Sequence, residues 1–568
     1  MAFIDTLVAA IPLLGILIFV HEFGHFIVAK ACRVRVLKFS IGFGAPIGFG
    51  EHRLRWERGG TEYVIGWIPL GGFVRMLGEV LPGDEEHIDV PTDAQPDEYL
   101  DAKPVWQKLA ISFAGPAMNL AFPILAFMIL LFAGIPRDGA IVGMVEHGSP
   151  AASVGIEPGD RVLAVGGEPI QYWGELAEAV MRTDAASLPL TVDRDGRELE
   201  LVVPVGRKER LDPFGDANDI GWIGVSWRRL PALLGVIDLE SPAARAGLRS
   251  GDQVVAVGEV EIEDWAGLER AYAAVTETGG GRVVPFTVLR GSLGSADESE
   301  KDRVVVDTPV VADLGTLGVV TATILVSDAA EGMPAAEAGI QRGDLVLGVD
   351  GEVVGSFASF ADLVQTSGGR ALRIDFARDG ELRSVVVKPV EREVAHPMDI
   401  AGMTQTFYQI GVRQALATLP GESTLERTRN PLVALPRAVE MTIDVSKRYL
   451  EALGKLASGS VGAEQLSGPI GIAEIARKSL DRGWTTYLST MIFISINLGF
   501  LNLLPIPILD GGQILLFAVE GIKRSPISAR TREVTQQFGL LVLVGLMCLA
   551  FYNDLSRHWE QFVKWLSA

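Results

Sequence analysis

Two histidines and a glutamate near the N-terminus have the types and spacing that metal-dependent hydrolysis requires. The pentapeptide His21-Glu22-Phe23-Gly24-His25 puts two imidazoles at positions i and i+4, which share one face of a helix. Together they can hold a zinc ion, and the Glu22 carboxylate can take a proton from an attacking water. The apolar run Leu7–Ala29 around them is long enough to cross a bilayer. Because unused polar groups are costly in lipid, this setting favours a metal site over histidines that only pack, and it argues against a soluble zinc hydrolase.

A carboxylate far along the chain can complete that site. A hydrolytic zinc centre has three protein ligands and one open position. An apolar run from about Tyr487 ends in the segment 502–512, which reads Asn-Leu-Leu-Pro-Ile-Pro-Ile-Leu-Asp-Gly-Gly. At about 1.5 Å per helical residue, His21 and Asp510 are both expected in the inner half of the membrane. Asp510 is therefore the predicted third ligand, beside His21 and His25; the alternative is a carboxylate that only caps the C-terminus of a helix.

The composition is that of a membrane protein with a large soluble part. The 568 residues are 48% hydrophobic, and mean hydropathy is +0.29. Four spanning helices are expected within residues 1–33, 106–136, 485–513 and 537–555. The net charge of -21 argues against a nucleic-acid partner. Two cysteines distant in sequence, Cys32 and Cys548, give no disulfide framework.

The distribution of basic residues predicts the orientation. No Lys or Arg precedes the first apolar run, and no small-residue cleavage site ends it, so it is not expected to be a signal peptide. Basic residues collect from Lys30 onward, and such residues favour the cytoplasmic side. We therefore expect a multi-pass protein of a bacterial inner membrane whose N-terminus faces outward.

Between the first two spans, residues 34–105 do not resemble a helix. Residues 34–78 are rich in glycine and alternate in places, which predicts a membrane-associated β-hairpin region. An acidic stretch, Glu79 to Pro104, is expected to be a flexible cytosolic loop. The second span contains Gly115, Pro116 and Asn119, an irregular point that either lies beside the zinc helix or forms a kink with a satisfied Asn.

A long repeat occupies the middle of the chain. The tripeptide Pro-Ala-Ala begins at 150, 242 and 334, a Gly-Asp pair follows at 159, 251 and 343, and Trp173, Trp265 and Phe357 recur at the same spacing. A fixed long period with matched turn residues predicts three copies of one α+β domain, expected at 137–208, 220–312 and 316–392. The pattern resembles the bacterial, circularly permuted PDZ domain. That resemblance implies binding of an extended peptide, although a spacer or size filter remains the alternative. Residues 425–480 suit amphipathic surface helices or a connector packed on the core.

Taken together, the motifs resemble the site-2 protease family of intramembrane zinc metalloproteases. The matching pieces are the pentapeptide 21–25, the β-region segments 39–44, 60–65 and 69–72, the segment 467–470 and the segment 502–512. The resemblance implies Zn²⁺ held by His21, His25 and Asp510, with Glu22 as general base. It also implies that Asn502 holds the substrate backbone, and that the β region around Gly71, Gly72, Phe73 and Val74 pairs with an unwound substrate strand.

The fold expected is a polytopic α-helical membrane protein with a β-hairpin region and three inserted α+β PDZ-like domains. The expected substrate is a pre-trimmed single-span membrane protein, such as an anti-sigma factor or a remnant signal peptide. The PDZ-like repeats would lie on the periplasmic side, and the active site towards the cytoplasmic side. The chain departs from the family in having three such repeats instead of two, and in Gln513, where a histidine is common. Competing hypotheses are a catalytically silent zinc-binding scaffold and a transporter.

Overall fold

The computed structural model describes residues 2–48, 53–78, 93–211, 217–277, 283–291, 301–395, 404–415, 418–458, 468–525 and 527–566. Ser467 and most of the expected acidic loop lie outside these ranges. The chain divides into two compact units, one formed by 1–135, 395–404 and 426–568, the other by 136–394 and 405–425.

The first unit is helical, with one small sheet. Its elements are α1 (Ala2–Ala31), β1 (Val36–Pro46), β2 (Arg55–Arg58), β3 (Thr61–Met76), the short 3₁₀ helix η1 (Pro96–Glu98), α2 (Val105–Ala133), α10 (Pro431–Ala457), α11 (Pro469–Asp481), α12 (Trp484–Asn502), α13 (Asp510–Lys523) and α14 (Ala529–Leu566). Four of these helices have segments long and apolar enough to span a membrane, at 5–31, 105–133, 484–502 and 530–556. Among the described residues, the count of four expected spans is thus confirmed.

Helices α1 and α2 pack closely because of one glycine. A Cβ atom on Gly24 would lie 2.4 Å from the backbone oxygen of Ala114, far inside van der Waals contact. Any larger residue there would force the helices apart. Gly24, the fourth residue of the pentapeptide 21–25, therefore sets the distance between the two helices.

The third apolar run differs from the single span expected at 485–513. Helix α12 ends at Asn502, and a separate helix, α13, begins at Asp510. The prolines Pro505 and Pro507 explain the break, since each lacks a backbone N–H and excludes the regular helix around it. Asp510 is consequently the first residue of a helix, and the alternative that it caps a helix C-terminus is wrong.

The expected surface region 425–480 contains helices α10 and α11, and both pack on the membrane helices. Ala434 and Ala438 of α10 are buried against α2 and α12, while Leu432 on the same helix is 81% exposed. Ala476 of α11 packs against α1. Helix α10 therefore combines the two expected roles, with one face packed on the core and another apolar and exposed.

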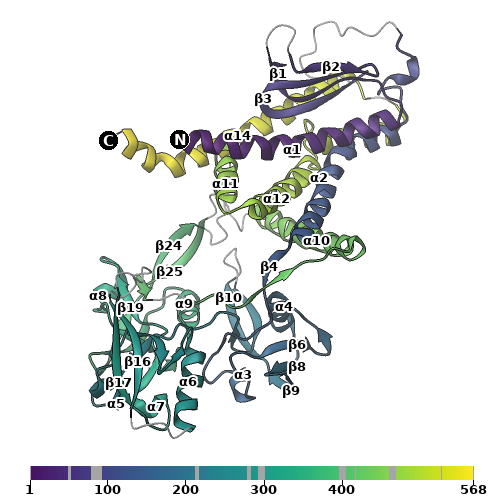
Figure 1. Ribbon diagram of the computed structural model, residues 1–568. Helices are drawn as coiled ribbons and strands as arrows, with labels where there is room; N and C mark the ends of the chain where they lie inside the picture. Colours follow the sequence, from purple (N-terminus) through teal and green to yellow (C-terminus); the bar gives the residue numbers. More distant parts are fainter. Residues whose placement is uncertain are drawn as a thin grey trace. The chain divides into compact units, whose positions relative to one another are not determined.

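The sheet beside α1 is antiparallel (Figure 1). Strand β3 folds around β1: Ser40 of β1 pairs with Val64 on one arm of β3 and with Phe73 on the other. Strand β2 pairs only with the first arm. The second arm, residues 72–76, is thus an edge, since no further strand pairs with it in the described chain.

The second unit contains three copies of one arrangement (Figure 1). The first copy has β5 (Met144–Val145), α3 (Pro150–Ser153), β6 (Arg161–Val165), β7 (Glu168–Pro169), α4 (Trp173–Arg182), β8 (Ser187–Arg194), β9 (Arg197–Pro204), β10 (Gly206–Leu211), β11 (Ala217–Trp222) and β12 (Val225–Ser226). The second has β13 (Leu234–Val236), α5 (Pro242–Ala246), β14 (Gln253–Val257), β15 (Val260–Glu261), α6 (Trp265–Glu277), β16 (Val283–Gly291), β17 (Lys301–Pro309), α7 (Leu314–Leu317) and β18 (Val319–Thr321). The third has β19 (Val326–Ala329), α8 (Pro334–Glu337), β20 (Leu345–Val349), β21 (Glu352–Val353), α9 (Phe357–Thr366), β22 (Leu372–Arg378), β23 (Glu381–Val387), β24 (Val390–Ala395), β25 (Thr404–Gln409) and β26 (Val412–Gln414).

Each copy has a four-stranded sheet with the same order: β7-β6-β8-β9, β15-β14-β16-β17 and β21-β20-β22-β23. A small second pairing closes each copy, β5 with β12, β13 with β18, and β19 with β26. These closing strands extend the copies beyond the expected ends at 208, 312 and 392. The short strands carry too little periodicity to be predicted. Strands β4 (Ile135–Asp138) and β27 (Ser423–Glu426) pair with each other.

The Gly-Asp signature of the repeats forms a buried ion pair in every copy. Asp160, Asp252 and Asp344 are at most 1% exposed and bind Arg194, Arg290 and Arg378, respectively, through two N–H···O bonds of 2.6–2.8 Å. Each arginine also donates to a backbone carbonyl four residues before the Gly-Asp pair, that of Gly155, Gly247 or Gly339. The repeated aspartate therefore holds the fold of each copy together.

Candidate metal centre

Three side chains from two helices meet at one point. The Nε2 atom of His21 lies 3.1 Å from Oδ2 of Asp510, and Nε2 of His25 lies 3.4 Å from Oδ1 of the same carboxylate. The two Nε2 atoms are 3.3 Å apart. One possible ligand atom from each of the three residues thus lies within 4.8 Å of the other two. Two imidazole nitrogens and one carboxylate oxygen are a donor set that suits zinc.

Local structure explains how these residues meet. His21 and His25 are one helical turn apart on α1, so their side chains project from the same face. Asp510 is the first residue of α13, after the proline-containing connection 503–509. The helix N-terminus that carries Asp510 favours the negative charge of the carboxylate.

Helix α2 provides space for the cluster. A Cβ atom on Gly115 would lie 2.2 Å from Nε2 of His25 and 2.8 Å from Cε1 of His21. Only glycine leaves room for both imidazoles in this position. The lack of a side chain at Gly115 thus leaves a space that a methyl group would fill. This space beside both imidazoles is an independent sign that the residues fit a metal ion.

Polar groups on α2 also contact the Nδ1 atoms of both histidines, the ring nitrogens that lie away from Asp510. Nδ1 of His25 lies 2.7 Å from the carbonyl oxygen of Ile111, to which it can donate. Nδ1 of His21 lies 3.2 Å from Nδ2 of Asn119. Such contacts fix the orientation of a ligating imidazole and determine which nitrogen is left for the metal. The sequence indicated Asn119 only as part of an irregular point; the structure shows a continuous helix α2 there.

The other sequence-predicted residues lie close to the cluster. Nδ2 of Asn502, the last residue of α12, is 3.5 Å from Nδ1 of His21. Gly72 lies against α1, where an added Cβ would be 3.1 Å from Cγ of Glu22. The Glu22 side chain interacts with the backbone of Val74. The edge arm of β3 therefore runs beside Glu22. The ring of Phe73 stacks on that of Phe43, with ring centroids 6.2 Å apart.

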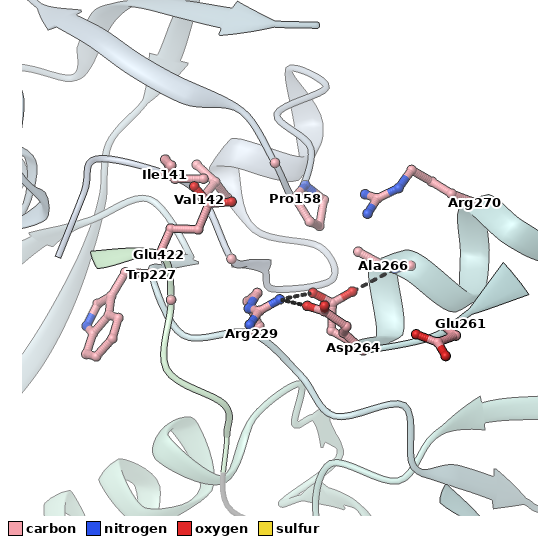
Figure 2. Close-up of a pocket in the computed structure, with 15 residues that line it drawn as sticks. Ile141, Val142, Pro158, Trp227, Arg229, Glu261, Asp264, Ala266, Arg270 and Glu422 are labelled. Carbon is pink, nitrogen blue, oxygen red and sulfur yellow. Dashed lines mark hydrogen bonds and ion pairs between the residues drawn. The ribbon is translucent and has the colours of Figure 1, made fainter. Parts of the chain in front are cut away.

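The second unit has a recess of a different character (Figure 2). Its volume is about 360 Å³, and residues of the first and second repeats line it, including Pro158 and Arg270. Arg229 within it binds Glu263 and Asp264 at 3.2 and 3.0 Å. Its charged groups are arginines and carboxylates, and no His, Cys or carboxylate cluster of metal-ligand geometry was found there among the described residues. The recess does not contain any of the predicted site residues.

A helix that carries the pentapeptide His21-Glu22-Phe23-Gly24-His25, a distant aspartate and a scaffold of candidate membrane helices together define the class of metallopeptidases that work at the membrane. Comparison with known proteins agrees. The model of peptidase family M50 matches residues 9–546, and the chain belongs to that family. It is a metalloprotease of the site-2 type.

Relatives match over nearly their whole length. The regulator of sigma-E protease RseP of Escherichia coli (strain K12) is 31% identical over 564 residues, which cover 98% of this chain and 100% of the relative. Protease RseP of Yersinia pestis is 30% identical, with 98% and 100% covered. A protein of Xylella fastidiosa (strain Temecula1), whose name assigns it provisionally to the zinc metalloproteases, is 30% identical, with 95% and 96% covered.

Proposed function

We propose that this protein hydrolyses a peptide bond within the transmembrane segment of a single-span membrane protein, using zinc held by His21, His25 and Asp510. The observation that carries the proposal is the meeting of these three side chains at the junction of a candidate membrane span and α13. The crevice that Gly115 leaves beside both imidazoles supports a metal there. When bound, zinc supplies Lewis-acid polarisation of the scissile carbonyl and lowers the pKa of the attacking water.

Glu22 is the proposed general base. Its carboxylate follows directly after His21 on the helix and lies beside the edge arm of β3. An Oε atom there takes the proton of the attacking water and returns it to the nitrogen of the leaving amine. The scaffold alternative gives no role to this carboxylate, because a metal site without turnover needs no base.

The β3 edge is the proposed site of substrate pairing. A transmembrane helix hides its carbonyls in internal hydrogen bonds, so the substrate has to unwind before cleavage. Addition of the unwound strand to the edge at Gly71–Val74 would replace those bonds. Gly72 supports this arrangement, because its lack of a side chain lets the edge lie within contact distance of Glu22. Asn502, partly exposed at the end of α12, would hold the substrate backbone.

The substrate is proposed to be trimmed before it enters. Anti-sigma factors and remnant signal peptides are single-span proteins of the expected kind, and two of the relatives named above are called RseP. The three repeats are proposed to lie on the periplasmic side, where they exclude untrimmed proteins, bind a new C-terminus, or do both. The protein would be a multi-pass protein of the bacterial inner membrane.

The test compares wild type with Glu22→Gln on a model single-span substrate, with and without a folded outer domain. Glu57→Gln, the same change on exposed strand β2, is the matched control. We expect wild type and Glu57→Gln to cleave only the trimmed substrate, and Glu22→Gln to retain zinc without cleaving. If wild type binds zinc and cleaves no trimmed substrate, the scaffold gains support; if the protein binds no zinc, the proposed metal site is refuted.

A further inference from the structure

Asn119 is buried in direct contact with one of the proposed zinc ligands. It is 1% exposed, and its Nδ2 lies 3.2 Å from Nδ1 of His21. Its Oδ1 is buried without a hydrogen-bond partner among the described residues. An unmade hydrogen bond at a buried amide costs about 1–3 kcal/mol. A buried amide in a membrane helix with one unsatisfied atom therefore calls for a function.

The chemistry of imidazole indicates that function. If Nε2 of His21 binds zinc, its lone pair faces the metal and the ring proton resides on Nδ1. That Nδ1–H needs an acceptor, and an amide NH₂ group offers none. A half-turn of the Asn119 amide exchanges its oxygen with its nitrogen, which brings Oδ1 to the position 3.2 Å from Nδ1. The oxygen then accepts the proton that lacks an acceptor, and Nδ2 takes the buried position that Oδ1 leaves.

His25 has an equivalent arrangement. Its Nδ1 is 2.7 Å from the carbonyl oxygen of Ile111, which can only accept. His25 is therefore held with its proton on Nδ1 and with Nε2 available. With the Asn119 oxygen as acceptor, both ligands adopt the same tautomer, and both are fixed by groups of α2.

Asn502 is the competing partner for His21. Its Nδ2 is 3.5 Å from the same Nδ1, and one N–H makes one good hydrogen bond. Asn119 is closer and more buried, and its backbone carbonyl accepts a 2.7 Å hydrogen bond from the Ser495 hydroxyl of α12. Asn119 is thus the more firmly placed of the two amides.

From these contacts we infer that Asn119 is a positioning residue, whose Oδ1 accepts from Nδ1 of His21 and so presents Nε2 to zinc, while Asn502 stays available to the substrate. The inference rests on the proposed zinc site. It assigns separate tasks to the two amides that meet at His21.

The test measures zinc affinity on full-length protein in lipid nanodiscs by competition with a chromophoric chelator. The variants are Asn119→Leu, which removes the amide at similar volume, Asn119→Asp, which keeps only acceptors, and Asn502→Leu. The matched control is Asn497→Leu, which removes an amide of α12 that accepts from Tyr449 instead of contacting a histidine.

We expect Asn119→Leu to weaken zinc binding about 10- to 100-fold, and Asn119→Asp to keep affinity within a few-fold. Asn502→Leu and Asn497→Leu should bind zinc like the parent, and Asn502→Leu should lower kcat/KM.

The outcomes are distinguishable. Parental affinity in Asn119→Leu would overturn the inference. Equal losses in Asn119→Asp and Asn119→Leu would show that the NH₂ group matters, and would overturn the acceptor role. Weaker zinc binding in Asn502→Leu than in Asn119→Leu would show that Asn502, and not Asn119, positions the His21 imidazole. If Asn119→Leu does not fold, the other variants are compared with the parent: a loss of zinc affinity of more than a few-fold in Asn119→Asp, or any such loss in Asn502→Leu, overturns the inference. A parent that binds no zinc would refute the proposed function, and this inference with it.

Discussion

Replacing Gly115 by alanine should disable the metal centre without weakening the helix that carries it. The added Cβ would lie 2.2 Å from Nε2 of His25, whereas real Cβ atoms essentially never approach below 3.0 Å. The imidazole must therefore shift by about 0.8 Å, the difference of these distances. Zinc ligands tolerate deviations of only about 0.2 Å. His21 must also give way, because the same Cβ would lie 2.8 Å from its Cε1.

The expected result is a large loss of zinc affinity, on the order of 10- to 100-fold or more, as when the orientation of a ligand is lost. Cleavage by any zinc-loaded fraction should fall about 100-fold, since a displacement near 1 Å in a catalytic group has that effect. The helix itself should not be weakened, because alanine favours a helix over glycine by about 1 kcal/mol; this gain offsets part of the roughly 1–3 kcal/mol that crowding of the imidazoles costs.

The assay is zinc affinity and cleavage of the trimmed single-span substrate, with thermal unfolding measured in parallel. Gly15→Ala is the matched control: it makes the same change in membrane helix α1, where an added Cβ meets nothing within 4 Å. Gly15→Ala should retain zinc and activity. If Gly115→Ala binds zinc and cleaves as well as Gly15→Ala, the close approach of α2 to the two histidines is refuted.

Three further predictions follow from contacts elsewhere. Removing divalent metal with a membrane-permeant chelator should abolish cleavage, and added zinc should restore it; persistent activity in metal-free protein would contradict the zinc site. Asp252→Ala should destabilise the second repeat by about 3 kcal/mol, because it leaves Arg290 without its buried partner; hydrogen exchange of that repeat measures this, and exposed Asp302→Ala should leave exchange unchanged. Glu520→Leu should strand the buried Lys108, 3.4 Å from the carboxylate, and lower the thermal stability of the first unit by several degrees; an unchanged unfolding temperature would show that this ion pair does not hold α13 against α2.

The parts of the fold that the sequence predicts are those whose signals are local. The apolar runs predict four membrane helices because the bilayer demands long unbroken hydrophobic segments. The i, i+4 spacing of His21 and His25 predicts one shared face of a helix. The juxtaposition of Asp510 with them required a further argument, from depth in the membrane and from the cost of an isolated carboxylate in lipid.

The parts that the sequence leaves open depend on distant partners. The signature aspartates recur at a fixed period, but the arginines that bind them follow at intervals of 34, 38 and 34 residues. The repeat of Arg194, Arg290 and Arg378 is therefore blurred by loops of unequal length. Prolines near 505 predict a break but not the new helix that begins at Asp510, because the start of that helix depends on its packing against α2.

The candidate metal centre is formed where one face of α2 packs against one face of α1. Ile111, Gly115 and Asn119 are spaced by four residues, so they lie on the same face of their helix. Ile111 contacts His25, Gly115 leaves room for both imidazoles, and Asn119 contacts His21. Because the order of contacts along α2 is opposite to the order along α1, the helices run antiparallel here and each ligand meets a different group. A shift of α2 by one turn would put a side chain into the space beside Gly115 and would remove the hydrogen-bond partners of both histidines at once. The register between α1 and α2 therefore determines the geometry of the metal-ligand atoms.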